Sequence, residues 1–342
     1  MAQRFVVIGA GAIGCRVGGA LAAAGADVVV VARGRRSADL AAHGLAVTEL
    51  DGATRILSPD RFRLAATAAE AAAMGGAHPV LLLCTKGGAT AEAAAEAGAA
   101  FAPGTPILSL QNGVDNIGRI RAAAPDLQAL AAMVPFNVTL DHDESGRLVA
   151  RQTTSGELHA EDHAVTRALA PLFAAAGLPL TLVADMAPVQ WGKLLLNLNN
   201  PVNALSGLPL RAELMDRDCR RALAALQDEA LAVMTAAGIR PAKIGAAPPR
   251  LIPTILRLPT FAFSRIAASM LTIAPTARSS MADDLAAGRP TEIDDLCGAV
   301  VRLAAARGMA APRNAAMVRL VSGRRPGTAM SGRDILAAVT AA

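Results

Sequence analysis

Tyrosine is absent from this 342-residue chain, and aromatic residues make up only 2% of it. A proton relay built on a tyrosine–lysine pair, as in short-chain dehydrogenases, is therefore excluded. No basic run is interleaved with aromatic residues on which bases would stack, which argues against nucleic-acid binding. The net charge of +5 instead suits an anionic small molecule.

Histidine, cysteine and lysine are also scarce. All five histidines precede residue 164, so the second half of the chain must work without imidazole. The four cysteines are scattered and form no C-x-x-C pair, which predicts free thiols in a reducing compartment and no metal site. Only three of the 33 basic residues are lysines, which hints that a compact, titratable ammonium is required where one occurs. They are Lys86, Lys193 and Lys243.

Targeting and membrane signals are missing as well. The first apolar run, 5–8, leads directly into a glycine-rich turn, with no charged leader region and no cleavage site. No apolar run reaches membrane-spanning length. We therefore expect a cytoplasmic protein with no membrane partner.

Two domains are predicted, over residues 1–184 and 185–342. The first alternates short apolar strands with helical stretches at 12–24 and 89–101, a βαβ pattern typical of a Rossmann-type, doubly wound parallel sheet. A weaker β pattern covers 131–160. The second domain is predicted to be all-helical. The expected strands are 5–8, 28–31, 80–83, 107–110 and 180–183. The expected helices of the second domain are 186–200, 211–238, 261–274, 280–287 and 292–307.

A glycine-rich turn closes the first strand and opens the first helix. Its sequence, Gly9-Ala10-Gly11-Ala12-Ile13-Gly14, matches the G-x-G-x-x-G dinucleotide fingerprint in the required strand–turn–helix context. We expect Gly9, Gly11, Ala12, Ile13 and Gly14 to contact the cofactor, with the pyrophosphate at the helix N-terminus. An ordinary turn between strand and helix is the alternative.

The second strand ends without the carboxylate that would bind an NAD ribose. Arg33 follows this strand instead, where it would clamp a 2′-phosphate, so we expect NADP (NADPH) as the cofactor. A solvated arginine loop is the alternative. Lys86 and Asn112 follow two further strands, at the edge of the sheet where ligands bind. Simple turn chemistry would also explain Asn112.

Lys193, Asn197 and Asn200 are spaced to share one face of an otherwise leucine-rich helix, with Pro201 predicting an end or kink at Asn200. A buried stripe of polar groups is costly unless they have partners, so we expect this face to line a cleft between the two domains. An exposed polar helix face is the alternative. Further on, Ser280 and Thr291 fit helix-start capping, Glu292 fits a helix N-terminus, and Gly288 and Gly308 fit helix ends.

Together these motifs make the whole chain resemble the ketopantoate reductase (2-dehydropantoate 2-reductase) family. They are G-A-G-A-I-G, T-K-G, Q-N-G-V, W-x-K-L-x-x-N and S-S-M-x-x-D-x-x-x-G-R-x-T-E-I-D. The resemblance implies a helical domain like that of 6-phosphogluconate dehydrogenase after the Rossmann domain. Two positions depart from the family pattern. Asn200 follows Asn197 by three residues instead of four, and Ala277 replaces a polar residue for which Arg278 would have to compensate, unless the substrate differs.

The resemblance also implies the roles of individual residues. Lys193 matches the catalytic lysine, and Glu292 matches its acidic partner, which also contacts the cofactor. The positions that match substrate-binding residues are Asn112, Asn197, Asn200, Ser280 and Asp284. The positions that match cofactor-binding residues, beyond the glycine turn, are Arg33, Lys86 and Asn112.

The expected activity is NADPH-dependent reduction of a 2-keto acid to a 2-hydroxy acid, most simply ketopantoate to pantoate in pantothenate biosynthesis, with Lys193 as general acid. A small 2-keto acid is the expected partner, no metal is needed, and the assembly is compatible with a homodimer. One alternative is a reductase of another branched or hydroxylated 2-keto acid. A different class is a non-catalytic NADP-binding regulator, against which the presence of both Lys193 and Glu292 argues.

Overall fold

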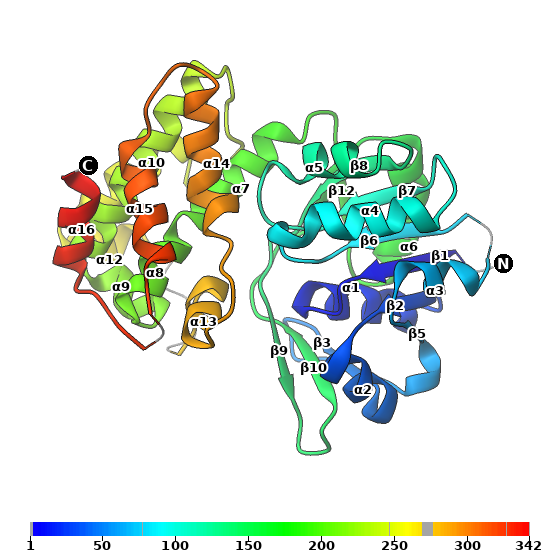
Figure 1. The fold of residues 1–342 in the computed structure, drawn as a ribbon. Coiled ribbons are helices and arrows are strands. Elements are labelled where there is room, and N and C mark those ends of the chain that lie inside the picture. The colour runs from blue at the N-terminus through cyan, green and yellow to red at the C-terminus, as the bar shows by residue number, and fades with distance from the viewer. Residues whose placement is uncertain (1–2, 77, 246, 269–275, 326, 342) are drawn as a thin grey trace. The chain divides into compact units, whose positions relative to one another are not determined.

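The computed structural model describes residues 3–76, 78–245, 247–268, 276–325 and 327–341 (Figure 1). The chain divides into two compact units, Met1–Met186 and Ala187–Ala342. Unit 1 is an α/β structure around a largely parallel sheet, and the regular elements described in unit 2 are all helices. This is the fold class that the sequence predicts. None of the described helices is both long and apolar enough to cross a membrane.

The sheet of unit 1 has eight strands, and its neighbours run parallel except where β11 meets β8. In spatial order the strands are β12 (Leu180–Val183), β11 (Leu158–Glu161), β8 (Gln128–Met133), β7 (Pro106–Ser109), β6 (Val80–Leu83), β1 (Arg4–Ile8), β2 (Asp27–Val31) and β5 (Arg63–Ala65). The helices are α1 (Ala12–Ala23), α2 (Gly34–His43), α3 (Ala68–Ala73), α4 (Thr90–Ala100), α5 (Asn116–Ala123) and α6 (Ala164–Ala175), with short 3-10 turns η1 (Pro59–Arg61) and η2 (Gly87–Ala89).

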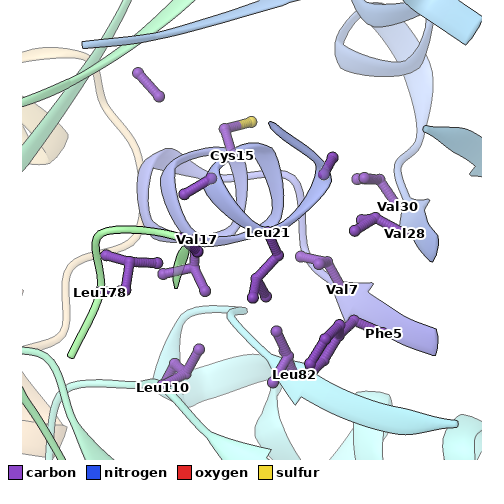
Figure 2. Close-up of a cluster of buried hydrophobic side chains, with 14 of the residues drawn as sticks. Phe5, Val7, Cys15, Val17, Leu21, Val28, Val30, Leu82, Leu110 and Leu178 are labelled. Atoms are coloured by element: carbon purple, nitrogen blue, oxygen red, sulfur yellow. The ribbon is translucent and has the colours of Figure 1, made fainter. Parts of the chain in front are cut away.

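The central strands are buried on both faces, which explains their uninterrupted apolar sequences. Phe5 and Val7 of β1 point into a cluster with α1 and α6 on one face (Figure 2). Val6 and Ile8 point into a second cluster with α3, α4 and α5 on the other face. Successive side chains of a strand alternate between faces, so one apolar strand supplies both layers.

A second sheet covers the outer side of α1. Its strands are ordered β4 (Thr54–Leu57), β3 (Leu45–Thr48), β10 (Leu148–Gln152) and β9 (Val138–His142). Arg16 of α1 is fully buried beneath it and forms an ion pair with Glu49, which directly follows β3. The sheet pairs β3 with β10 across about a hundred residues of sequence, and the weak β pattern at 131–160 did not predict it.

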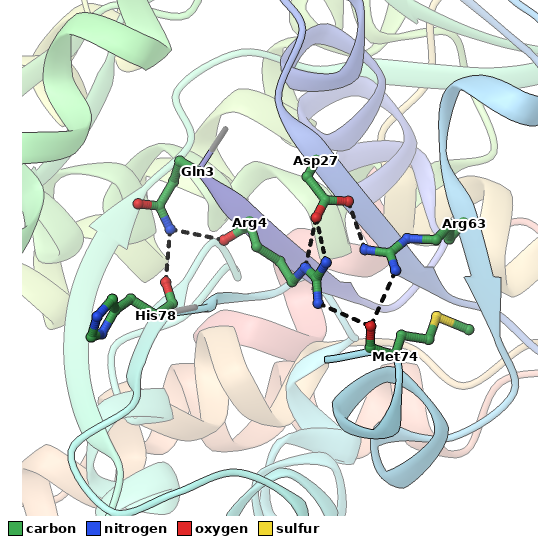
Figure 3. Close-up of polar contacts among 6 residues, drawn as sticks. All are labelled: Gln3, Arg4, Asp27, Arg63, Met74 and His78. Atoms are coloured by element: carbon green, nitrogen blue, oxygen red, sulfur yellow. Dashed lines mark hydrogen bonds and ion pairs between the residues drawn. The ribbon is translucent and has the colours of Figure 1, made fainter. Parts of the chain in front are cut away.

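Charged residues join three strands at the end of the sheet opposite the glycine turn. Arg4 donates through Nε and a terminal nitrogen to Asp27 Oδ2 at 2.7 and 2.6 Å, and Arg63 donates to Asp27 Oδ1 at 2.7 Å (Figure 3). Both arginines also reach the carbonyl of Met74. Partial burial alone would raise the pKa of Asp27, but the hydrogen bonds and charges of the two arginines outweigh it and lower this pKa.

Unit 2 is built around the long helix α10 (Arg217–Ala236), which contacts α8, α9, α11, α14, α15 and α16. The other helices are α7 (Ala187–Asn197), α8 (Asn199–Ser206), α9 (Leu210–Met215), α11 (Ile252–Arg257), α12 (Thr260–Ile266), α13 (Ser280–Ala286), α14 (Ile293–Ala305), α15 (Pro312–Ser322) and α16 (Gly332–Thr340), with a 3-10 turn η3 (Pro249–Leu251).

Three expected helices of unit 2 differ from the prediction, and the one at 186–200 is described with the site below. The single helix at 211–238 is α9 followed by α10, because Asp216 adopts extended backbone and caps α10 by accepting from the amides of Asp218 and Cys219. The helix at 261–274 is α12 up to Ile266, and residues 269–274 lie outside the described part of the chain.

The carboxyl group of Glu213, on α9, is buried next to the start of α8. Glu213 has no exposed surface, and Asn199 Nδ2 donates to its Oε2 at 3.0 Å. Within the described residues, Glu213 Oε1 and Asn199 Oδ1 have no hydrogen-bond partner. Burial, reinforced by the charge of Asp216, raises the pKa of Glu213 to about 8. The carboxyl is therefore protonated in the folded protein at neutral pH.

Because folding raises the pKa of Glu213, unit 2 becomes less stable as the pH rises. An unfolded glutamate has a pKa of 4.5 and the folded one about 8, so between these values the folded state binds one proton more. Its free energy of unfolding then falls with rising pH, by up to about 1.4 kcal/mol per pH unit. We expect Glu213→Gln to raise the free energy of unfolding at pH 7 by about 1–3 kcal/mol, with the gain vanishing near pH 4.5.

Fluorescence of Trp191, the single tryptophan, follows unit 2 through urea unfolding. Glu144→Gln, in an exposed turn of unit 1, is the matched charge control and should leave the midpoint unchanged. A Glu213→Gln protein that is less stable than the parent throughout pH 5–8 would contradict this prediction.

Candidate active site

Two positions in the turn between β1 and α1 require glycine, Gly9 and Gly14. Gly9 has a φ of +108°, and a Cβ there would lie 2.9 Å from the backbone nitrogen of Thr85. A Cβ on Gly14 would lie 2.0 Å from the carbonyl oxygen of Gly9. The first contact brings the turn close to the segment after β6, and the second brings the start of α1 close to the end of β1. Close helix–strand packing is the role that the dinucleotide fingerprint gives to its third glycine.

Gly11 differs from its two neighbours, because a Cβ there would meet only the Cys84 carbonyl, at 4.0 Å. Gly11 is exposed and occupies the N-cap of α1 without a side chain to cap the helix. The first amides of α1, at Ala12 and Ile13, have no partner within the helix. The open space and the helix N-terminus therefore fit a pyrophosphate, whose oxygens would accept from these amides.

A cavity of about 320 Å³ continues from this turn within unit 1. It is lined by Ile8, Gly9, Ala10, Val31, Ala32, Arg33, Arg36, Thr85, Ala89, Glu92, Ala93 and Glu96. Arg33 therefore lines the same cavity as the glycine turn. Its Nε donates to the carbonyl of Ala66 at 3.0 Å, and one terminal nitrogen lies 2.8 Å from both carboxylate oxygens of Glu96. Neither Glu92 nor Glu96, the two glutamates that line the cavity, is evident as a site residue from the sequence.

A buried polar network holds the ends of β6 and β7 together. Gln111 Nε2 lies within hydrogen-bonding distance of the Thr85 carbonyl and of Thr90 Oγ1, at 2.9 and 2.8 Å. Thr90 donates to Asn116, which in turn donates to the carbonyl of Asn112 at 2.7 Å. Lys86 follows Thr85 and is exposed. The network fixes the backbone that carries Lys86 and Asn112. In the sequence, only the Gln111-Asn112-Gly113 motif indicated that polar groups gather here.

In unit 2, the expected single helix face is split between two helices. α7 ends at Asn197 and α8 begins at Asn199, so Lys193 and Asn197 lie on α7 whereas Asn200 lies on α8. The prediction of an end or kink at Asn200 is wrong by two residues. Pro201 lacks an N–H to donate to the carbonyl of Asn197, so the helical hydrogen bonds are interrupted before Asn200.

Lys193 is half-buried, and desolvation lowers the pKa of its ammonium from 10.5 to about 8. The neighbouring Gly192 allows the segment after α10 to pass close to α7. A Cβ on Gly192 would lie 2.4 Å from the Ala242 carbonyl, and the Ala242 amide donates to Pro188 at 2.7 Å. This close crossing covers the face of α7 that carries Pro188 and Gly192.

The predicted cap at Ser280 is wrong by one residue. Ser279 caps α13, because its Oγ accepts from the amide of Ala282 at 3.1 Å, whereas Ser280 is the exposed first residue of the helix. Ser279 also donates to the Asn200 carbonyl at 3.3 Å, and its own amide donates to Asn203 Oδ1 at 2.9 Å. Asn203 is fully buried and was missed by the sequence reasoning; it ties α13 to α8.

Asp284 lies in the last turn of α13, and Glu292 immediately precedes α14. Asp284 is 7% exposed and accepts from Arg289 Nε at 3.0 Å. Glu292 is half-buried at the N-cap position of α14, without a capping hydrogen bond from its side chain. The expected cap at Thr291 is therefore wrong, because α14 begins at Ile293. Arg278, which would have to compensate for Ala277, lies 3.6 Å from Asp283.

The predicted site residues thus form two groups. The glycine turn, Arg33, Lys86 and Asn112 belong to unit 1, where the first two share the cavity. The residues in unit 2 are Lys193, Asn197, Asn200, Ser280, Asp284 and Glu292. No group of three or more histidine, cysteine, aspartate or glutamate side chains in the described residues is arranged to hold a metal ion.

Comparison of the chain with known proteins identifies the family to which it is similar. The model named Ketopantoate reductase PanE/ApbA matches residues 5–163, and the model of its C-terminal part matches residues 185–325. A 2-dehydropantoate 2-reductase of Halobacterium salinarum is 27% identical over 91% of this chain and 95% of its own length.

Solved structures agree. A ketopantoate reductase from Ralstonia eutropha JMP134 is 30% identical with a TM-score of 0.75, covering 94% of this chain and 97% of that one. A D-mandelate dehydrogenase bound to NADH and anilino(oxo)acetate has a TM-score of 0.74 over 94% of this chain and 98% of its own, but at 18% identity it shows the fold alone. The chain therefore belongs to the ketopantoate reductase family and is an oxidoreductase that reduces 2-keto acids.

Proposed function

We propose that the protein reduces 2-dehydropantoate to pantoate with NADPH, and that Lys193 donates the proton. The observation that carries this proposal is the half-buried ammonium of Lys193 on α7, whose pKa of about 8 suits proton donation near neutral pH. The family match and the names of the full-length relatives support the substrate.

The cofactor would be held in unit 1. The amides at the start of α1 would bind the pyrophosphate above Gly11, and Arg33 would bind the 2′-phosphate in the cavity. Lys86 and Asn112 lie on the backbone fixed by Gln111, and they would contact the part of the cofactor beyond the pyrophosphate. Asn112 would also contact the substrate. When bound, the dinucleotide supplies the hydride that reduces the ketone carbon.

Lys193 would act on the substrate oxygen. As the ketone is reduced, negative charge develops on this oxygen, and a cationic ammonium both stabilises the charge and transfers a proton to it. The product is the alcohol, and the neutral amine is then protonated again from solvent. Glu292 would orient Lys193 or bind a substrate hydroxyl, and would also contact the cofactor. Asn197, one helical turn from Lys193, would donate to the substrate.

The substrate carboxylate would be bound at the start of α13. Ser280 is exposed at the first position of this helix and makes no capping bond, so its hydroxyl is available to an anion. Asn200 lies on the helix to which Ser279 ties α13, and Asp284 lies one turn after Ser280. These three residues would define how the keto acid is oriented.

A second candidate is reduction of a different 2-keto acid. The absence of a polar residue at Ala277, with Arg278 close to Asp283, favours this reading, and the fold is shared with a D-mandelate dehydrogenase. Initial rates with a panel of 2-keto acids, each with NADPH and NADH, would separate the readings. Our proposal requires the highest kcat/KM for 2-dehydropantoate with NADPH. Cofactor binding without turnover of any keto acid would instead indicate a regulator.

Replacing Lys193 tests the mechanism. We expect Lys193→Met to lower kcat by about 10²–10⁴-fold, the usual contribution of general acid catalysis, while NADPH still binds. Because only the protonated lysine can donate, kcat/KM of the parent enzyme should fall as the pH rises through about 8. The variant should lack this basic limb.

Lys243→Met is the matched control, since Lys243 is an exposed lysine of the same unit. It should keep both the rate and the pH profile. A Lys193→Met enzyme with near-parental kcat would refute the mechanism, and the proton would then come from water or Lys86.

Adjacent serines separate binding from capping at α13. Ser279→Ala should lower the free energy of unfolding by about 1 kcal/mol, because it removes the N-cap. Ser280→Ala should leave stability within about 0.5 kcal/mol but raise KM for the keto acid about tenfold to a hundredfold, as expected for a lost hydrogen bond to a charged group. If Ser280→Ala keeps its KM, the carboxylate is bound elsewhere.

A further inference from the structure

The charged residues of the cavity in unit 1 balance one another. Two arginines, Arg33 and Arg36, and two glutamates, Glu92 and Glu96, line it. The 2′-phosphate that distinguishes NADPH from NADH carries close to two negative charges, so a pocket selective for NADPH gains from an excess of positive charge. Here the two glutamates cancel that excess.

The guanidinium of Arg33 is already engaged on the side that binds oxyanions best. Its Nε donates to the Ala66 carbonyl, and the terminal nitrogen beside it lies 2.8 Å from each oxygen of Glu96. A phosphate that binds through this bidentate edge must displace the carboxylate. The hydrogen bond and charge of Glu96, with a smaller contribution from Glu92, raise the pKa of Arg33, as a close pairing requires.

Glu96 would still face the cavity after its displacement. Glu92 and Glu96 are spaced i, i+4 on α4, so both carboxylates lie on the helix face that lines the pocket. The side chains of Arg33 and Glu96 are 58% and 37% exposed, so the ion pair is weak enough to exchange. The released carboxylate would repel a 2′-phosphate, whereas it would accept a hydrogen bond from the free 2′-hydroxyl of NADH.

We propose that Glu96 determines cofactor specificity, by competing with the 2′-phosphate for Arg33 and so limiting the preference for NADPH over NADH. This inference rests on the proposed NADP site. Glu96 acts from a helix distant in sequence from the strand end that normally carries the discriminating carboxylate. The strand end alone therefore indicates NADPH and gives no sign of this competing carboxylate.

Binding of cofactor fragments tests the proposal without turnover. Calorimetry would give Kd values of 2′-phospho-ADP-ribose and ADP-ribose for the parent, Glu96→Gln, Arg33→Ala and the double variant. Glu96→Gln keeps the size of the side chain, and should tighten binding of the phosphorylated fragment about threefold to twentyfold. Its Kd for ADP-ribose should not fall. In the Arg33→Ala background, Glu96→Gln should give a smaller gain, because it then removes only the repulsion between the carboxylate and the phosphate and no competition for Arg33.

Glu144→Gln makes the same charge change on an exposed turn outside the cavity, and should leave both Kd values unchanged. An equal gain in Glu144→Gln, or an unchanged ratio of Kd values in Glu96→Gln, would overturn the proposal while leaving the dinucleotide site intact. If the parent protein binds neither fragment, the proposed cofactor site fails, and the role of Glu96 fails with it.

Discussion

The close approach of α1 to β1 is the constraint on which unit 1 depends. No side chain fits at Gly14, because its Cβ would lie 2.0 Å from the Gly9 carbonyl. With the helix seated this closely, its buried face fills the cluster above the sheet, and its N-terminus points its amides toward the edge where β1, β2 and β6 end. A larger residue at Gly14 would therefore disturb the core and the anion site together.

In unit 1, five of the eight strands of the main sheet and the helices α1 and α4 were predictable, because the strands are short apolar runs and the helices have a matching period. The second sheet was not, since β3 pairs with β10 across about a hundred residues and no local pattern specifies that pairing. In unit 2, sequence periodicity predicted the stretches that form α7–α10 and α12–α14, but it predicted neither their breaks nor the helices α11, α15 and α16. Asp216 and Pro201 each interrupt a run that looks continuous by hydrophobicity alone.

The site residues show the same difference between local motifs, which could be predicted, and contacts distant in sequence, which could not. The glycine turn is a local motif, and its geometry follows from its own sequence. The ion pair of Arg33 with Glu96 joins residues 63 positions apart, and the contact of Ser279 with Asn203 joins residues 76 apart. Such contacts arise only when the sheet or the helix pair has assembled. This is why Arg33 was foreseen but its carboxylate was not, and why the cap of α13 was assigned to the neighbouring serine.

The break at Leu198 has a consequence for how unit 2 tolerates changes of length. In a continuous helix, removing one residue rotates everything beyond it by about 100°. Here α8 is oriented by its own contacts, through Asn203, Ser279 and the buried Glu213, and not by the rotation of α7. We therefore expect this break to absorb one residue more or less between Asn197 and Asn200, with the direction of Lys193 on α7 unchanged.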